Sequence, residues 1–167
     1  MWQSGMVAAL FAGVSLGVQQ PAREATVHDA AGKDAGRVTM REVSGRITVK
    51  VHLQGLPAGI HGLHLHETPK CDPPGFASAG GHYNPTHREH GRQNPRGPHL
   101  GDLGNITVSG NGQGDREVTI TAALAGQGIP AFLGAGLALI VHANADDEKT
   151  DPSGNAGSRI ACAVILP

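Results

Sequence analysis

The sequence of 167 residues is poor in aromatic side chains, which make up only 3% of it. A hydrophobic core must therefore be built from Val, Ile, Leu and Ala. No segment carries a sustained helical period of apolar residues, which argues against a helical bundle. No internal repeat occurs, and the 25 glycines follow no collagen-like period. The length fits one domain with a short tail, because single domains usually span about 100–200 residues.

An excess of charge of either sign is also lacking. The formal net charge is −1, and the 13 Lys and Arg residues form no cluster. Binding to nucleic acid or to an anionic membrane surface depends on such a basic patch. We therefore expect neither among the partners of this protein.

Cysteine is scarce, with Cys71 and Cys162 as the two examples. No CxxC motif occurs, which excludes the usual cysteine-based zinc ribbon and thioredoxin-like redox motif, and neither residue stands in a catalytic-cysteine signature. The two residues are either free and buried or, if the protein is exported, joined in one long-range disulfide.

No apolar run is long enough to span a bilayer. The uncharged run Met6–Val18 has the length of the hydrophobic region of a signal peptide. However, residues 1–5 contain no Lys or Arg, and no clean A-x-A cleavage site follows. We expect residues 1–23 to be a signal peptide or a disordered tail, and residues 24–167 to form the domain.

Alternation of apolar and polar residues is the dominant pattern, and it is typical of β-strands. In residues 46–54 every second side chain from Ile47 to Leu53 is aliphatic, which predicts a half-buried antiparallel strand. Shorter patterns predict further strands at residues 24–29, 36–43, 60–67, 102–108, 117–123, 137–142 and 159–165. About eight short strands with turn signals between them favour an all-β sandwich or barrel.

Two long segments interrupt this strand pattern. Residues 68–101 are rich in Gly, Pro and His and poor in apolar side chains. Loops of this length within a compact domain are usually functional or disordered. Metal ligands could supply the ordering that hydrophobic burial cannot supply here. Residues 143–158 form a second polar, turn-rich loop.

The predicted strand around residues 60–67 carries the first functional signal. Side chains two positions apart on a strand share a face, so His64 and His66 project together while Leu63 and Leu65 face the core. A polar face that happens to be rich in histidine is the alternative to a metal site. Further histidines downstream, in a chain that has ten, favour the metal site.

The candidate ligands fall into two chemical sets. The first set offers four imidazoles and no sulfur, which suits a tetragonal Cu(II) ion; its members are His64, His66, His82 and His142. The second set lies in or at the end of the first long loop and comprises His90, His99 and Asp102. With one further nitrogen, this set would form a closed tetrahedral zinc site.

At this point the sequence resembles the copper/zinc superoxide dismutase family, over roughly residues 25–167. The segments that carry the resemblance are His61–Glu67, Gly80–Pro85, His90–Gly91, His99–Asn105, Val141–His142 and Gly154–Cys162. The resemblance implies an all-β, eight-stranded antiparallel Greek-key sandwich or barrel with two long functional loops. The segment between Cys71 and His82 is longer than in the animal enzymes and similar to bacterial members.

The resemblance also implies the site residues. Copper would be bound by His64, His66, His82 and His142, and zinc by His82, His90, His99 and Asp102. His82 would thus bridge the two metals as an imidazolate. Asp146 matches the carboxylate that links His64 to His90 and so orients both rings. Cys71 and Cys162 match the family disulfide.

Two residues match catalytic roles. Arg159 matches the cation beside the open copper position, where a permanently charged guanidinium would attract an anion. On reduction of copper, His82 is expected to leave the metal and take up a proton that it later donates. Ser153 matches a hydroxyl residue at the channel mouth. His61 matches a structural histidine, and the remaining three histidines, His28, His52 and His87, are expected at the surface.

The function implied by the resemblance is superoxide dismutation by copper cycling between Cu(II) and Cu(I), with superoxide as the substrate. The alternatives are a copper-binding or copper-delivery module of the same fold without turnover, and a structural sandwich that has lost its metals. The resemblance allows a homodimer. It also favours a secreted or periplasmic protein, or one associated with the cell envelope, with no stable membrane span.

Overall fold

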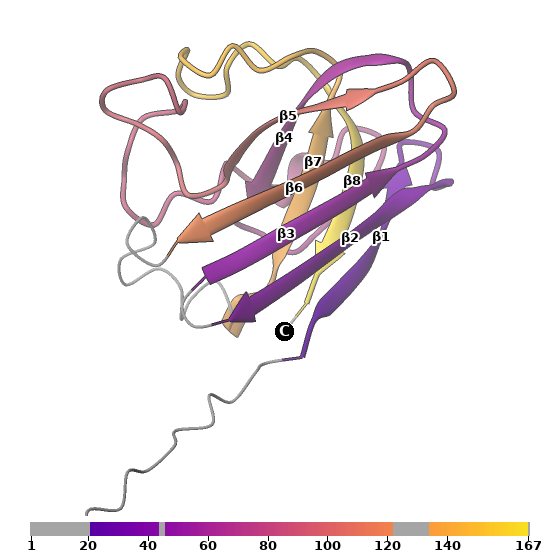
Figure 1. Ribbon diagram of the computed structural model, residues 1–167, viewed down its shortest axis with the longest axis horizontal. Helices are drawn as coiled ribbons and strands as arrows, with labels where there is room; N and C mark the ends of the chain where they lie inside the picture. Colours follow the sequence, from indigo (N-terminus) through magenta and orange to yellow (C-terminus); the bar gives the residue numbers. More distant parts are fainter. Residues whose placement is uncertain (1–20, 44–45, 122–133, 167) are drawn as a thin grey trace, which may run out of the picture.

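The computed structural model describes residues 21–43, 46–121 and 134–166 (Figure 1). These residues form eight strands and one short 3₁₀ helix, η1 (Ala77–Ala79). The strands are β1 (Arg23–Asp29), β2 (Asp34–Val43), β3 (Arg46–Leu53), β4 (Gly59–His66), β5 (Asp102–Val108), β6 (Gly114–Thr121), β7 (Leu137–His142) and β8 (Arg159–Ile165). Each predicted strand corresponds to one of them, although residues 122–123 of one prediction lie outside the described residues. Most of the predicted N-terminal segment, residues 1–20, also lies outside them.

The strands form one antiparallel sheet in the order β5-β4-β7-β8-β1-β2-β3-β6. The sheet curls into a nearly closed barrel, with β1, β2, β3 and β6 in front and the other four strands behind them in Figure 1. In this order β3 is not a neighbour of β4, and β6 is not a neighbour of β7, so the connections between them cross to another part of the sheet. That topology confirms the predicted Greek-key β-fold.

The core is aliphatic, as the scarcity of aromatic residues required. On β3 the side chains of Ile47, Val49 and Leu53 are 0% exposed, while Lys50 and His52 on the other face are exposed. A second, smaller cluster lies outside the barrel, where the first long loop packs on β7 and β8. Its members are Phe76, Ala79, Ala138, Ile140 and Cys162. All six residues of β7 are therefore buried.

Backbone bonds hold the middle and the C-terminal end of the first long loop against β4. Leu65 donates its N–H to the Gly101 carbonyl at 2.8 Å, and Tyr83 donates its N–H to the Leu65 carbonyl at 2.8 Å. His66 and His82 form an isolated antiparallel bridge. These contacts bring residues 82 and 101 next to the strand that carries His64 and His66.

A disulfide joins Cys71 of the first loop to Cys162 of β8, across a sequence separation of 91 residues. The pairing implied by the family resemblance is therefore confirmed. It fastens the loop to the barrel at the small outer cluster.

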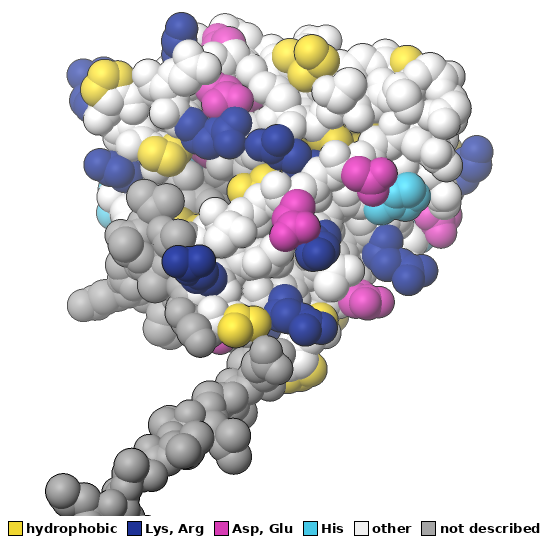
Figure 2. All heavy atoms as spheres, in the orientation of Figure 1, with side chains coloured by type: hydrophobic (Ala, Val, Ile, Leu, Met, Phe, Trp, Pro, Cys, Tyr) yellow, Lys and Arg dark blue, Asp and Glu magenta, His cyan; other side chains and the backbone are white. Residues whose placement is uncertain are grey.

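The outer face of the front strands, seen in Figure 2, carries interspersed charges of both signs. Two pairs across β3 and β6 are Lys50–Glu117 at 3.2 Å and His52–Asp115 at 2.9 Å. None of the helices in the described ranges has the length and hydrophobicity needed to cross a membrane.

Loss of the disulfide should destabilise the protein. In the chain-entropy model, a closed loop of this length stabilises the folded state by about 4–5 kcal/mol. We expect the double substitution Cys71→Ser with Cys162→Ser to lower the free energy of unfolding by this order, measured by chemical denaturation. Thiol titration of the denatured, natively isolated protein should find almost no free thiol. Two titratable thiols would contradict the pairing.

Candidate metal centre

The predicted ligands converge at one end of the barrel, where β4, β5 and β7 meet the two long loops. Strand residues supply His64 and His66 from β4, Asp102 from the start of β5 and His142 from the end of β7. The first loop supplies His82, His90 and His99, and the second supplies Asp146. The structure thus brings all of these sequence-predicted residues together.

The local geometry of β4 explains why its histidines face the loops. Leu63 and Leu65 belong to the barrel core, so the alternation of the strand directs His64 and His66 to the opposite face. A register shift between Gly62 and His64 places His64 opposite Asp102 of β5. Both histidines are nevertheless almost fully buried, because the two loops cover this face of the strand.

Within the part of the chain that the structure describes, four ring nitrogens in this region are buried and have no hydrogen-bond partner. They are His64 Nδ1, His66 Nε2, His82 Nε2 and His142 Nε2. These four residues can each direct a ligand atom to a common point, with all four atoms within 4.8 Å of one another. An unpaired buried polar atom costs free energy. Four such atoms aimed at one point therefore fit a bound cation.

The other nitrogen of each of these rings is engaged by the protein. His66 Nδ1 donates to the Gly80 carbonyl at 3.0 Å, and His142 Nδ1 donates to the Gly157 carbonyl at 3.0 Å. His64 Nε2 donates to the Asp146 carboxylate at 2.9 Å. These bonds fix the tautomer of each ring, so that the unpartnered nitrogen carries a lone pair toward the common point.

The four rings also form a closed cycle. Successive ring centroids are separated by 4.1 Å for His64–His82, 4.9 Å for His66–His82, 6.1 Å for His66–His142 and 4.8 Å for His64–His142. The two diagonals, His64–His66 and His82–His142, are longer, at 6.5 and 6.4 Å. Such a four-cornered set of nitrogen ligands suits Cu(II).

A second cluster surrounds Asp102. The Oδ1 atom lies 3.0 Å from His82 Nδ1, 3.0 Å from His90 Nδ1 and 3.3 Å from His99 Nδ1. His82 Nδ1 and His99 Nδ1 are themselves 3.3 Å apart. Ligands about 2.0 Å from a tetrahedral zinc ion lie about 3.3 Å from one another. The nitrogens of His82, His90 and His99 therefore surround this oxygen at spacings that suit zinc, and His64, His82, His90 and Asp102 also offer ligand atoms that all lie within 4.8 Å of one another.

Backbone amides hold the other carboxylate oxygen of Asp102. Gly91 and His99 each donate an N–H to Oδ2 at 2.9 Å. This arrangement directs Oδ1 toward the three imidazoles. His82 is the residue that the two clusters share, because its Nδ1 lies in the Asp102 cluster and its Nε2 in the four-ring cluster.

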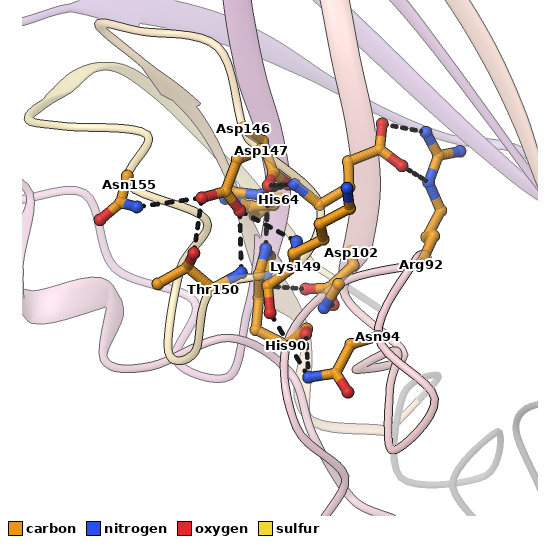
Figure 3. A network of polar contacts seen from close by, with 12 residues as sticks. His64, His90, Arg92, Asn94, Asp102, Asp146, Asp147, Lys149, Thr150 and Asn155 are labelled. Carbon is orange, nitrogen blue, oxygen red and sulfur yellow. Dashed lines mark hydrogen bonds and ion pairs between the residues drawn. The ribbon is translucent and has the colours of Figure 1, made fainter.

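Asp146 links the two clusters by bonding His64 of one and His90 of the other (Figure 3). Its Oδ2 accepts from His64 Nε2 at 2.9 Å, and its Oδ1 accepts from His90 Nε2 at 3.0 Å. Gly154 has a positive φ of 63°, and a Cβ at that position would overlap the Asp146 carboxylate. The tight turn of the second loop around Asp146 therefore requires glycine there.

Contacts that the sequence did not reveal fasten the two loops together. Arg92 of the first loop forms a two-pronged ion pair with Glu148 of the second, at 2.9 and 2.6 Å. Asp151 accepts the His90 N–H at 2.6 Å. Asn105 bonds both the N–H and the carbonyl of Asp146 through its side-chain amide. Of Arg92, Glu148, Asp151 and Asn105, only Asn105 had a sequence signal, because it lies within a family motif.

Arg159 lies at the start of β8 and is half-buried. Its NH1 and NH2 groups donate to the carbonyls of Phe76 and Gly80, each at 2.7 Å. The Gly80 carbonyl is also the acceptor for His66 Nδ1. Arg159 and a ligand of the four-ring cluster therefore share one anchoring oxygen. An open hollow of about 610 Å³ adjoins Arg159 and is also lined by Gly157 and Ser158.

Other residues take more peripheral places. Lys149 lines a different hollow, together with Arg96 and Asp151. Ser153 is half-buried, and its role at a channel mouth stays a prediction. The buried ring of His61 lies 2.8 Å from the His142 carbonyl, as befits a structural role. The three histidines expected at the surface, His28, His52 and His87, are exposed.

Comparisons with known proteins agree with this geometry. Residues 34–165 match the family described as copper/zinc superoxide dismutase (SODC). Superoxide dismutase [Cu-Zn] 1 of Aquifex aeolicus is 37% identical over 150 residues, covering 88% of this chain and 89% of that protein. Superoxide dismutase [Cu-Zn] of Caulobacter vibrioides is 41% identical over 145 residues, covering 84% and 83%.

Solved structures give the same result. The crystal structure of a SOD-like protein from Bacillus subtilis superposes with a TM-score of 0.77 at 33% identity, covering 86% of this chain and 97% of that one. The Cu/Zn superoxide dismutase from Brucella abortus superposes with a TM-score of 0.68 at 30% identity, covering 87% and 99%.

Burial sets the protonation of the four-ring cluster. Desolvation lowers the pKa of His64 to about 3, that of His66 to about 2 and that of His142 to about 4. Burial alone would also lower the pKa of His90, but hydrogen bonds from both ring nitrogens to Asp102 and Asp146 raise it to about 9. The first cluster thus stays neutral and able to bind a cation at neutral pH.

Burial and hydrogen bonding also act in opposite directions on the pKa values of the two buried carboxylates. Desolvation alone would raise the pKa of Asp102 and Asp146. Hydrogen bonds from the surrounding histidines and from backbone amides outweigh it, and both pKa values lie well below their usual range. Both groups therefore remain ionised throughout the neutral and mildly acidic range.

The metal-free protein should be most stable near about pH 6.5, the usual pKa of histidine in an unfolded chain. Below that pH, His64, His66 and His142 become protonated in the unfolded chain but stay neutral in the folded protein. The free energy of unfolding therefore falls as the pH falls. His90 stabilises below about pH 6.5 and loses this contribution as the pH rises through about 9. Chemical denaturation of chelator-treated protein across this range measures the effect.

The expected slope on the acid side is at least about 1 kcal/mol per pH unit. A free energy of unfolding that stays constant between about pH 5 and pH 8 would contradict this assignment of protonation states.

Proposed function

This chain belongs to the copper/zinc superoxide dismutase family, and from that membership we propose which of its residues carry the reaction. The enzyme is an oxidoreductase that uses copper and zinc to convert two superoxide anions and two protons into dioxygen and hydrogen peroxide. Copper, when bound, supplies the one-electron chemistry by alternating between Cu(II) and Cu(I).

The proposed copper ligands are His64, His66, His82 and His142, and the proposed zinc ligands are His82, His90, His99 and Asp102. The observation that carries this assignment is the set of four buried ring nitrogens that have no hydrogen-bond partner among the described residues and point to one place. The zinc assignment is supported by the short spacings around Asp102 Oδ1.

His82 is proposed as the residue that takes up a proton and later donates it. Its Nδ1 belongs to the zinc cluster, so its Nε2 is the nitrogen that can hold a proton whenever it does not bind copper. Asp102 Oδ1 lies 3.0 Å from His82 Nδ1 and keeps the ring in place, so a proton on Nε2 stays at a fixed point within the four-ring cluster. Such positioned proton transfer is typical of general acid–base catalysis.

Arg159 is proposed as the cation that draws superoxide to the site. Its guanidinium is held by two carbonyls and lines an open hollow, so it presents a fixed positive charge to the entrance. Although burial lowers the pKa of Arg159, an arginine remains charged at every physiological pH.

A copper-binding module without turnover is the rival function. Such a module needs only the copper ligands, whereas the proposed assignment also gives this chain a complete zinc cluster, a bridging position for His82 and a cation at the entrance. Relatives named as copper/zinc superoxide dismutases further support the catalytic function.

We also propose export to the periplasm or cell exterior, or to the cell envelope. The disulfide supports an oxidising compartment, and Met6–Val18 is proposed as part of the signal sequence. Homodimer formation and the lack of nucleic-acid binding stay predictions.

Metal analysis paired with an activity assay on one purified sample tests the proposed function. We expect one copper and one zinc for each chain, because the ligands divide into two sets of four only if His82 is shared. His82→Ala should abolish the magnetic and optical signature of a bridged metal pair and most of the activity. A bridged signature that survives this substitution would overturn the assignment. Full metal loading without activity in the unmodified protein would favour the copper-binding module.

Arg159→Ala should lower the second-order rate with superoxide about tenfold at low ionic strength, because local electrostatic attraction accelerates the capture of anions. The rate should also lose much of its salt dependence. Lys149→Ala is the matched control, since Lys149 lines another hollow, and it should have less effect. Pulse radiolysis at several salt concentrations measures both. An unchanged low-salt rate in Arg159→Ala would show that another cation attracts the substrate.

A further inference from the structure

Each histidine of the proposed zinc cluster has a second ring nitrogen, Nε2, besides the Nδ1 atom that lies near the carboxylate at the start of β5. For His82 this second nitrogen belongs to the four-ring cluster, and for His90 it donates to Asp146 at 3.0 Å. For His99 it lies 3.8 Å from Oδ1 of Asp151, in the second loop. Asp151 therefore stands at His99 as Asp146 stands at His90.

Asp151 also contacts the main chain beside a second residue of the cluster. Its Oδ1 atom accepts the His90 N–H at 2.6 Å. The next amide along the chain, that of Gly91, donates to Asp102 Oδ2 at 2.9 Å. One carboxylate oxygen of the second loop therefore holds His90 by its backbone and faces the ring of His99.

A network of hydrogen bonds within the second loop shapes the turn that precedes Asp151 (Figure 3). Asp147 Oδ1 accepts the N–H groups of Lys149 and Thr150 at 2.9 and 2.8 Å. Its Oδ2 accepts from the Thr150 hydroxyl at 2.6 Å and from the Asn155 amide at 2.9 Å. These bonds, led by that of the Thr150 hydroxyl, lower the pKa of Asp147 to about 2. The turn is therefore held by an ionised carboxylate at neutral pH.

The surroundings of Asp151 leave its Oδ1 atom to the histidines. Arg96 lines the same open hollow, but it pairs with Glu89 at 2.6 Å. The Asp151 side chain is 51% exposed, whereas His90 and His99 are buried. Asp151 thus reaches from the surface of the second loop to two buried residues of the first.

A carboxylate at this place has a defined effect on a metal ligand. An imidazole that binds a metal through Nδ1 carries its proton on Nε2. A carboxylate near that N–H orients the ring and raises its basicity as a ligand. At 3.8 Å the interaction of Asp151 with His99 is electrostatic, because the distance exceeds that of a hydrogen bond.

We propose that Asp151 is a positioning residue that orients His90 and His99 for zinc and slows the release of zinc. This inference rests on the proposed function, because it takes the cluster around Asp102 as the zinc site. Asp151 acts through the two histidines and touches neither the metal nor the substrate. The second loop thus holds the zinc cluster at two points, through Asp146 and through Asp151.

The test is the rate of zinc release from the copper- and zinc-loaded protein into an excess of a chromogenic chelator. Loss of a group that orients a metal ligand typically weakens metal binding by about 10–100-fold. We expect Asp151→Asn to speed zinc release about tenfold, because the charge that faces His99 is lost. Asp151→Ala should speed it further, since the amide oxygen of Asn can still accept the His90 N–H.

Protein that holds Co(II) in place of zinc gives a second readout. The visible absorption bands of Co(II) report the orientation and donor strength of its ligands, which a loosened loop edge alone does not change. Asp151→Asn and Asp151→Ala should both shift these bands, and Asp151→Glu, which keeps a carboxylate, should restore part of the slow zinc release. Asp115→Asn is the matched control, because it removes one negative charge from an exposed residue of β6, and it should change neither readout.

Two results would overturn the proposal. One is zinc release and cobalt bands in Asp151→Asn that equal those of the unmodified protein, since only the backbone bond to His90 would then matter. The other is an equal acceleration in Asp115→Asn, which would assign the effect to net charge. Failure of the proposed function is distinct, because the fully loaded unmodified protein would then lack dismutase activity while the zinc-release rates of the variants still differed.

Discussion

The carboxylate of Asp146 between His64 and His90 is the contact on which the rest of the centre depends. Each of its oxygens accepts from one imidazole, so a single side chain orients a histidine in each cluster. A buried carboxylate is stable only when it is fully hydrogen-bonded. The Glu148 amide donates a further hydrogen bond to this carboxylate. Asn105 holds the backbone of Asp146, and the glycine at position 154 leaves room for the carboxylate. The loops around Asp146 are therefore shaped by the need to satisfy one buried charge.

The barrel and the two long loops are stabilised by different interactions because their compositions differ. The aliphatic barrel provides stability through apolar burial, whereas the two long loops have little apolar surface of their own. The loops are held by polar contacts, by the small cluster around Phe76 and by the disulfide. Metal binding at the Asp102 cluster would add further anchoring, because ligand binding to the folded state stabilises it. The same loops then carry both the site and its entrance.

The first loop also connects the disulfide with the surroundings of Arg159. The carbonyls of Phe76 and Gly80 hold Arg159, while Cys71 of the same loop is joined to β8. The disulfide therefore fastens to the barrel the segment that fixes Arg159 and the ring of His66.

The sequence by itself determined the strands and the ligand types. Alternation over residues 46–54 and the His64–His66 spacing follow from the geometry of a single strand, which repeats every two residues and needs no knowledge of distant contacts. Family motifs added the pairing of Cys71 with Cys162 and the link through Asp146. Only the tertiary structure decided which nitrogen of each ring is free, because that depends on carbonyls such as those of Gly80 and Gly157 from other parts of the chain. The Arg92–Glu148 ion pair and the contacts of Asp151 with His90 and His99 likewise arise between segments far apart in sequence, where no local pattern can predict contact.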